Sequence, residues 1–192
     1  MTKGPLDLVV EIASVLDDFG IPYALGGSLA SSLVGEPRST VDADIAVRLG
    51  DDRSAELFDR LTAKFYVPLD AAREAIASRS SFNLVDTAHG LKVDVFVLSD
   101  DLLDRMQIDR RVRVTIPGLP SDLWVTSPED QVLRKLQWFR DGGSVSDRQW
   151  RDVVAILRTR AGALDTQYLE TTAEAVGLDA LLSEAVEDAE CS

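Results

Sequence analysis

Apolar and polar positions alternate in short blocks through the first part of the chain. From Leu6 to Phe19 the apolar residues recur every three or four positions, which places them on one face of a helix, and Gly20 and Pro22 end that pattern. Several later blocks alternate every second residue, as half-buried strands do. These patterns predict helices at about 6–19, 28–33, 53–65 and 70–77, and strands at about 23–25, 41–47, 81–85, 91–98, 111–116 and 123–125.

The pattern changes after residue 125. The segment Ser127-Pro128-Glu129-Asp130 indicates a helix start, because serine can cap it, proline fits its first position and acids suit the positive end of its dipole. Only helical spacing follows. We predict an α+β (mixed α/β) fold, with a mixed sheet flanked by helices in a first domain, 1–125, and a C-terminal helical subdomain, 126–192. The helices of that subdomain are expected at about 128–140, 147–160, 165–176 and 178–189.

The composition is that of an ordinary folded globule. The chain has 192 residues, of which 45% are hydrophobic and 28% are charged. No apolar run approaches the roughly 18 residues of a membrane span, and no signal-peptide core follows the N-terminus. We therefore expect a cytoplasmic protein with no membrane partner. Cys191 is the single cysteine, so an internal disulfide is excluded.

The charge is unevenly distributed. The net charge of -13 argues against a general nucleic-acid coat protein, because phosphate backbones are bound by lysine and arginine. Residues 161–192 contain eight acids and no lysine or arginine, whereas residues 134–160 carry a local excess of four basic groups. An anionic ligand could bind along this basic stretch.

Asp42 and Asp44 provide the most informative pattern. They stand two positions apart in the apolar run 41–47, so in a strand both carboxylates point the same way, roughly 6.6 Å apart. On a buried strand they would repel each other or take up protons, whereas one or two Mg²⁺ ions could bind both. The turn Gly26-Gly27-Ser28 precedes them, and Asp94 interrupts a later apolar run.

These motifs resemble a known superfamily. A strand, a Gly-Gly-Ser turn that opens a helix, the pair Asp42-Ala43-Asp44 and a third acid, Asp94, resemble the nucleotidyltransferases of the DNA polymerase beta type. Residues 38–45 also resemble the R-x-T-x-D-h-D motif of AbiEii-type toxins and related bacterial nucleotidyltransferases. Lys135-Leu136 and Arg151-Asp152-Val153 are similar to a second motif of that group. Together the matches span residues 23–160.

The resemblance implies a metal-dependent transfer reaction. A nucleoside monophosphate would pass from a nucleoside triphosphate to an acceptor hydroxyl, assisted by Mg²⁺ or Mn²⁺. Asp42 and Asp44 would bind both ions. Asp94 would bind the acceptor-side ion and help to deprotonate the attacking hydroxyl.

Other residues are implied in binding the nucleotide. Gly26 and Gly27 would let the backbone approach the triphosphate, while the Ser28 hydroxyl and nearby amides would bind its outer phosphates. Lys135 would place a positive charge on the triphosphate, and Asp152 would orient Lys135 or an acceptor group. Arg38 would contact a phosphate or brace the loop before the carboxylate strand.

Each motif also has a simpler interpretation. Pairs of aspartates and glycine turns occur in many loops. Lys135 and Asp152 could equally be a surface lysine and a helix–helix salt bridge, which contributes little if it is exposed. His89 is expected in an exposed turn. The tryptophans could stack on a base or serve in packing.

Two classes of function therefore stay open. One is an enzyme whose acceptor is a tRNA end, a protein or a small molecule, in a toxin–antitoxin or defence context. The other is a catalytically silent protein of the same fold that binds nucleotide or a cognate toxin or antitoxin, with the acidic tail bound to a basic partner.

Overall fold

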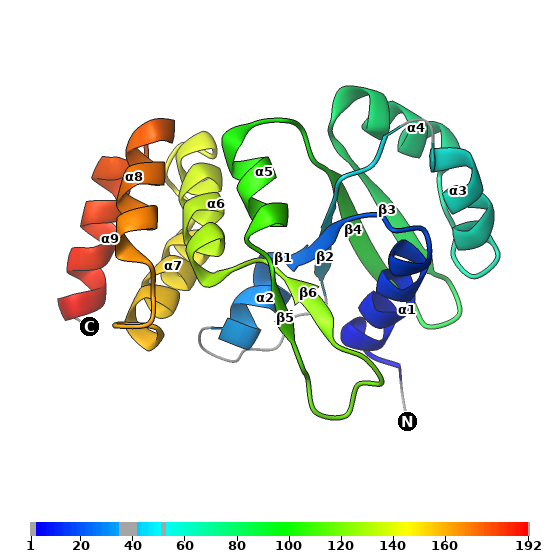
Figure 1. Ribbon diagram of the computed structural model, residues 1–192, viewed down its shortest axis with the longest axis horizontal. Helices are drawn as coiled ribbons and strands as arrows, with labels where there is room; N and C mark the ends of the chain where they lie inside the picture. Colours follow the sequence, from blue (N-terminus) through cyan, green and yellow to red (C-terminus); the bar gives the residue numbers. More distant parts are fainter. Residues whose placement is uncertain (1–2, 35–41, 51–52, 192) are drawn as a thin grey trace.

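A mixed β-sheet lies at the centre of the computed structural model, which describes residues 3–34, 42–50 and 53–191 (Figure 1). The strands follow the order β3-β4-β2-β1-β6-β5. Strands β1 and β2 are antiparallel, whereas β1 with β6 and β2 with β4 are parallel. The strands are β1 (Tyr23–Gly26), β2 (Ala43–Val47), β3 (Ser81–Asp86), β4 (Leu91–Val97), β5 (Val112–Val114) and β6 (Leu123–Val125).

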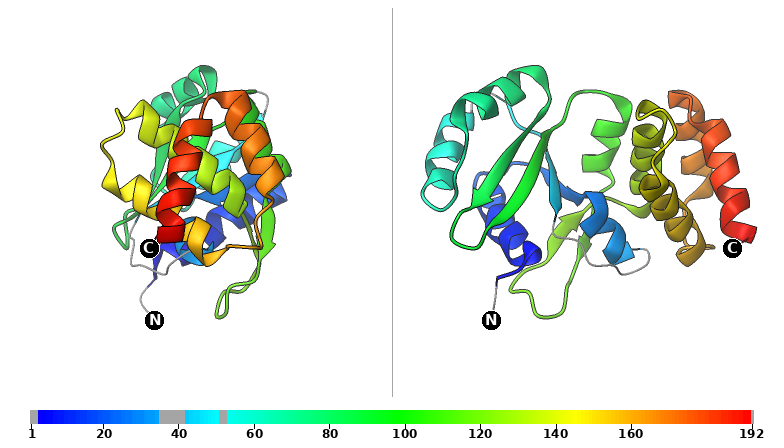
Figure 2. Two further views of the ribbon diagram at one scale, coloured as in Figure 1. Left: turned by 90° about the vertical axis from the view of Figure 1, so that its left-hand side faces the viewer. Right: turned by 180° about the vertical axis from the view of Figure 1, so that it is seen from behind.

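Helices cover the sheet and extend the molecule beyond it. Helix α1 packs against β1, β2 and β4, whereas α2 packs against β1, β2 and α7. The last four helices form a block at one end of the molecule, away from α3 and α4 (Figure 2). The helices are α1 (Pro5–Asp18), α2 (Gly27–Val34), α3 (Ser54–Thr62), α4 (Leu69–Ser78), α5 (Leu102–Asp109), α6 (Pro128–Asp141), α7 (Asp147–Thr159), α8 (Thr166–Val176) and α9 (Asp179–Cys191).

Two main clusters of buried apolar side chains stabilise these layers. The larger lies between the sheet and its helices and draws its members from Leu8 to Val125. The second lies among α6 to α9 and extends to Ala185, but it also includes Leu103 of α5. Helix α5 therefore packs on the helical block although it precedes residue 125 in the chain. The division into 1–125 and 126–192 stays a proposal.

The predicted fold class is confirmed, and the predicted strands and helices have counterparts in the described residues. Ser127 caps α6 as expected, since its hydroxyl accepts a hydrogen bond from the Asp130 amide at 3.1 Å. Helix α5 was missed. Its buried residues are Leu103, Gln107 and Ile108, so a polar side chain breaks the apolar periodicity that would have indicated it.

Strand β5 is shorter than predicted. The alternation suggested a strand at 111–116, but only Val112–Val114 pair with β6, which is itself three residues long. Because β5 is an edge strand, nothing on its other side extends the pairing. None of the helices among the described residues is long and apolar enough to cross a membrane.

Candidate active site

Two acidic side chains meet at the centre of the sheet because of strand register. Strand β2 runs parallel to β4, and Asp44 stands directly beside Asp94. Directly paired residues on neighbouring strands project to the same face, with strands about 4.8 Å apart. The same register places Asp44 opposite Gly26 on β1. The aspartates expected from separate segments are therefore brought to one face beside the glycine turn.

Burial and charge act together on Asp44. Its pKa is raised above the ordinary aspartate value, first by burial and then by the negative charges of Asp94 and Asp42. Lys135 and Lys92 oppose this effect. Asp42 lies just before β2 and is exposed, whereas Asp44 and Asp94 are half-buried. An added cation would relieve the repulsion among these carboxylates.

Gly27 allows the turn to approach the carboxylate. Its φ is +60°, and a Cβ built on it would lie 1.6 Å from Oδ2 of Asp44. A side chain at this position is therefore excluded both by the backbone conformation and by the aspartate. Gly26 is less restricted, since a Cβ there would come no closer than 3.5 Å to a neighbouring atom, the Gln107 amide nitrogen.

Ser28 connects the turn to the C-terminal helices. It is buried in the first turn of α2, and Nη2 of Arg148 donates a hydrogen bond to its hydroxyl at 2.7 Å. Arg148 belongs to α7, 120 residues further along the chain. No sequence motif indicates Arg148, apart from its place in the basic stretch 134–160. An arginine and a helix N-terminus here make a favourable site for an anion.

Lys135 is buried next to the same site. Lys135, on α6, is 2% exposed, and its Nζ contacts Asp152 at 2.7 Å and Gln149 at 3.2 Å, both on α7. Asp152 is 8% exposed. The pair is thus a helix–helix salt bridge, as in the simpler interpretation, but it is buried rather than exposed. The positive charge of Lys135 still lowers the pKa of Asp44.

A second lysine contacts the acids from the exposed side. Nζ of Lys92 lies 3.0 Å from Oδ2 of Asp94, and this hydrogen bond is the main reason why the pKa of Lys92 is raised. Among the described residues no group of three or more histidine, cysteine, aspartate or glutamate side chains stands close enough to hold a metal ion. The donor type, carboxylate oxygen, nevertheless suits Mg²⁺ or Mn²⁺.

Two cavities meet at Asp44. The first, about 360 Å³, is the Ser28-side cavity, bounded by Gly27, Ser28, Asp42, Asp44, Lys92, Asp94, Phe96, Lys135, Trp138, Arg148 and Gln149. The second, about 330 Å³, is the Gln107-side cavity, which shares Gly27, Asp44, Phe96, Lys135 and Trp138 with the first and adds Gly26, Ala46, Arg79, Ser80, Ser81, Val97, Leu98, Asp104, Gln107, Thr126, Gln131 and Arg134.

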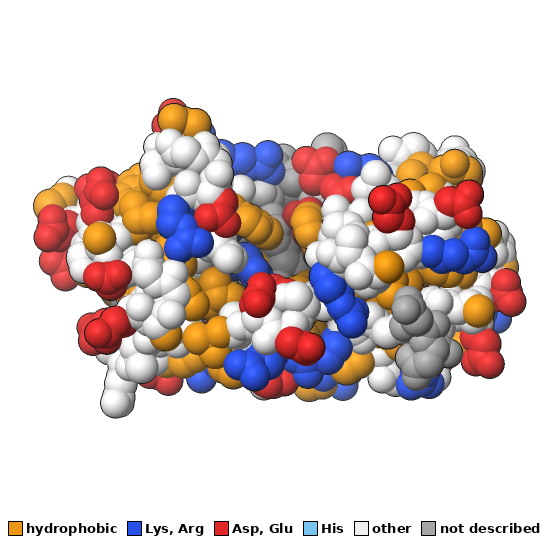
Figure 3. All heavy atoms as spheres, turned by 90° about the horizontal axis from the view of Figure 1, so that it is seen from above, with side chains coloured by type: hydrophobic (Ala, Val, Ile, Leu, Met, Phe, Trp, Pro, Cys, Tyr) orange, Lys and Arg blue, Asp and Glu red, His pale blue; other side chains and the backbone are white. Residues whose placement is uncertain are grey.

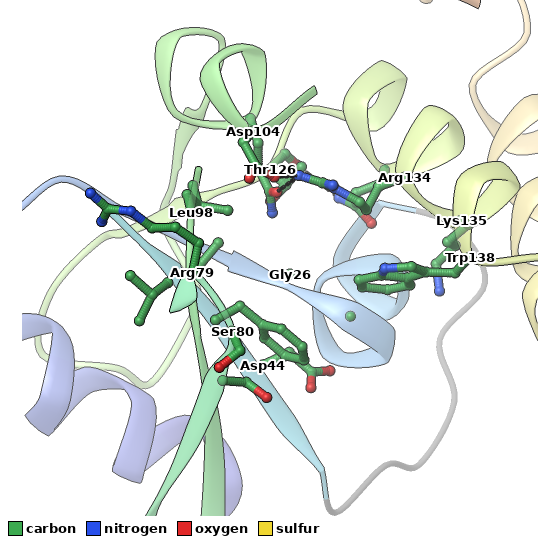
Figure 4. A pocket seen from close by; sticks show the side chains of 17 residues that line it. Gly26, Asp44, Arg79, Ser80, Leu98, Asp104, Thr126, Arg134, Lys135 and Trp138 are labelled. Atoms are coloured by element: carbon green, nitrogen blue, oxygen red, sulfur yellow. Dashed lines mark hydrogen bonds and ion pairs between the residues drawn. The ribbon is translucent and has the colours of Figure 1, made fainter. Parts of the chain in front are cut away.

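Figure 4 shows the Gln107-side cavity, with Asp44 on the sheet and Lys135 and Trp138 on the facing helix. The upper surface is hollowed between the helical block and the α3–α4 side, and hydrophobic, basic and acidic side chains border the hollow (Figure 3).

Of the remaining candidates, Trp138 alone among the described residues borders the site. Arg38 and Val41 are not among the described residues. His89 lies in the turn between β3 and β4 and contacts Asp86 at 2.9 Å, as expected for an exposed turn residue. Trp138 borders both cavities, whereas Trp124 is covered by Arg111 and Arg113. Trp150 packs in the helical cluster.

Comparisons with known proteins identify the fold. Neither a scan of protein-family models nor a search of curated proteins finds a match. The antibiotic-resistance factor ANT(2'')-Ia in solution superposes with a TM-score of 0.57 at 15% identity, over 92% of this chain and 93% of its own. The chain has the nucleotidyltransferase fold.

Two further structures agree. An antigenic nucleotidyltransferase-like protein from Paracoccidioides brasiliensis matches with a TM-score of 0.54 at 21% identity, over 94% of this chain and 91% of its own. ANT(2'')-Ia in complex with adenylyl-2''-tobramycin matches with a TM-score of 0.53 at 14% identity, over 88% of this chain and 97% of its own. At these identities the likeness concerns the fold, and it does not identify the AbiEii group.

Proposed function

We propose that the protein is a metal-dependent nucleotidyltransferase. The observation that carries this proposal is the pairing of Asp44 with Asp94 on adjacent strands, against a glycine turn in which a Cβ at Gly27 would collide with Asp44. In this arrangement the carboxylates of Asp44 and Asp94 border a cavity, and their mutual repulsion is unfavourable. A bound cation would offset that cost.

The carboxylates would bind the metal. Asp42, Asp44 and Asp94 would hold Mg²⁺ or Mn²⁺, which when bound neutralises charge on the phosphoryl oxygens and positions them. Asp94 would also accept the proton of the acceptor hydroxyl. The hydroxyl oxygen would then form a bond to the α-phosphorus, while the bond from that phosphorus to the bridging oxygen breaks and pyrophosphate leaves.

The Ser28-side cavity would bind the triphosphate. Ser28 and Arg148 are already joined at 2.7 Å, and both border this cavity together with Lys135. Their donors would contact the outer phosphates, assisted by amides of the turn at Gly26 and Gly27. Asp152 would orient Lys135 through their 2.7 Å contact. Arg38 remains a proposed phosphate contact outside the described residues.

The acceptor and the biological context are further proposals. ANT(2'')-Ia, of the same fold, has been solved with adenylyl-2''-tobramycin, which supports a small-molecule hydroxyl as acceptor. The AbiEii-like motifs instead support a tRNA end or a protein, with a cognate antitoxin or toxin. We place the protein in the cytoplasm, with the domain 1–125 supplying the acids and 126–192 closing the site.

One observation favours the silent alternative. Lys92 engages an oxygen of Asp94 at 3.0 Å, where a metal would bind in an active enzyme. In a protein that binds nucleotide without transfer, this ammonium would replace the cation permanently.

Transfer and binding can be separated with purified protein. Each α-labelled nucleoside triphosphate is incubated with Mg²⁺ and cell extract, and both pyrophosphate release and label transfer are followed. We expect the wild-type protein to release pyrophosphate and the Asp44→Asn variant to release none. The Asp59→Asn variant, whose substitution lies on the distant helix α3, should release pyrophosphate like the wild type. Nucleotide-dependent thermal stabilisation without release would support the silent alternative. The absence of both would exclude nucleotide binding.

A further inference from the structure

The Gln107-side cavity differs in chemistry from the Ser28-side cavity. It reaches Asp44 and Lys135 at one end, and its volume of about 330 Å³ suits a single small molecule. Much of its lining is apolar. The rings of Phe96 and Trp138 border it with centroids 6.2 Å apart and planes inclined by 36°, so they offer adjoining faces to a flat ligand.

Among the described residues that line the cavity, no carboxylate away from the catalytic end is available to a cationic ligand. Its acids are Asp44 and Asp104. Oδ2 of Asp104 accepts two hydrogen bonds from Ser99, from its amide and its hydroxyl, both at 2.6 Å. Oδ1 is bound by the guanidinium of Arg134. Both oxygens of Asp104 are thus engaged by protein donors.

Positive charge prevails on the wall instead. Arg134 is held in place by Gln107 at 3.1 Å and Gln137 at 2.9 Å, in addition to Asp104. Arg79 borders the same cavity and donates to the carbonyl of Leu49 at 2.7 Å. Because Asp104 is paired with Arg134, the formal charge that remains among the described lining residues away from the catalytic end is that of Arg79. An ammonium group entering there would lose its hydration and meet an arginine.

We propose that this cavity receives the acceptor, and that the acceptor is a compact ring-bearing alcohol that is uncharged or carries one negative charge. The proposal rests on the proposed function, because the hydroxyl is taken to point towards Asp44 and Asp94. Polyamines such as tobramycin are therefore expected to be poor substrates. An RNA end is disfavoured, because it would have to bring a phosphate backbone to a chain of net charge -13.

The test uses alcohols that differ in one group. Benzyl alcohols with a para hydroxyl, a para carboxylate or a para aminomethyl group, and tobramycin, are offered as acceptors with α-labelled ATP, GTP, CTP and UTP and Mg²⁺. We expect kcat/KM for the first two to exceed that for the two amines at least tenfold. Saturation-transfer NMR measures binding of the same alcohols to the metal-free protein, independently of any transfer.

Removing the positive charge of Arg134 should change which acceptor the cavity prefers. Arg134→Gln should release the Asp104 carboxylate and improve the aminomethyl alcohol relative to the carboxylate alcohol at least fivefold, in kcat/KM or in NMR affinity. Arg134→Lys should keep the original preference, because an ammonium can still pair with Asp104. Arg140→Gln, on the same helix but exposed at its far end, is the matched control. Thermal melting verifies that each variant is folded.

Nucleotide binding and acceptor binding are measured separately, so the acceptor assignment and the proposed function can fail independently. Calorimetry of each nucleoside triphosphate with Mg²⁺ tests nucleotide binding alone. If nucleotide binds but the ring alcohols are neither bound nor labelled, the acceptor assignment is wrong and the proposed function stands. Preference for an amine, or label transfer to RNA alone, also overturns it. If nucleotide does not bind, the proposed function fails, and the NMR preference still decides whether the cavity selects against cations.

Discussion

Substituting Gly27 by alanine tests whether the turn and the carboxylate form one site. The new Cβ would lie 1.6 Å from Oδ2 of Asp44, and ordinary contacts begin at 3.4 Å, so the carboxylate would have to retreat by about 2 Å. A displacement of about 1 Å in a catalytic group can reduce a rate by roughly 100-fold. We therefore expect Gly27→Ala to lower kcat/KM for nucleotidyl transfer by at least about 100-fold.

The free-energy cost of placing alanine in a left-handed backbone conformation can be measured separately from the clash with Asp44. A left-handed alanine costs roughly 1–2 kcal/mol, and Gly20 has the same φ of +60° with no atom within 4 Å of a Cβ. Gly20→Ala should therefore match Gly27→Ala in backbone destabilisation, measured by urea unfolding, while keeping its activity. Gly26→Ala, with contacts of 3.5 Å or more, should have a smaller effect than Gly27→Ala. Full activity in Gly27→Ala would refute the claim that this turn supports the catalytic carboxylate.

Three further predictions concern the charged residues. Asp152→Ala should destabilise the protein by about 3 kcal/mol in urea, because it removes a buried partner of Lys135, and Lys135→Met added to it should recover part of the loss. Asp86, whose pKa is lowered to about 2 chiefly by its hydrogen bond to Lys3, should stabilise the fold above pH 3.8, and this contribution should disappear as the pH falls through 2. Unfolding of Asp86→Asn should thus differ from wild type at pH 7 and converge with it near pH 2. Lys92→Met should tighten Mn²⁺ binding in calorimetry about two- to fivefold, since an exposed ion pair contributes roughly 0.2–1 kcal/mol; unchanged or weaker binding would show that Lys92 does not compete with the metal.

The elements that sequence patterns predicted well are those in which one local interaction dominates. The apolar positions of β2 and β4 alternate with Asp44 and Asp94, and the period of two places each acid on the face opposite its buried apolar neighbours in the same strand. The start of α6 was equally clear, because a capping serine and a proline act within one turn. Each of these features depends on residues a few positions apart.

The features that were missed depend on partners far apart in the chain. Arg148 becomes a site residue through its contact with Ser28, and Arg134 through its contact with Asp104, 30 residues away. No local periodicity encodes such pairs. Helix α5 was not predicted for a related reason. Its buried residue Gln107 contacts Thr126 and Arg134 rather than an apolar core, so it adds no apolar position to the helical pattern.

The helical block and the sheet are joined through the site itself. Gln131 at the start of α6 accepts a hydrogen bond from Ser31 of α2 at 3.1 Å and donates to the Thr126 carbonyl at 2.8 Å. Ser28, on the same helix α2, contacts Arg148 of α7. Helix α2 is thus fixed by polar contacts to both α6 and α7, and its N-terminus is the glycine turn beside Asp44. An anion bound at Ser28 and Arg148 would contact both parts at once, so its binding would stabilise their association as well as the turn.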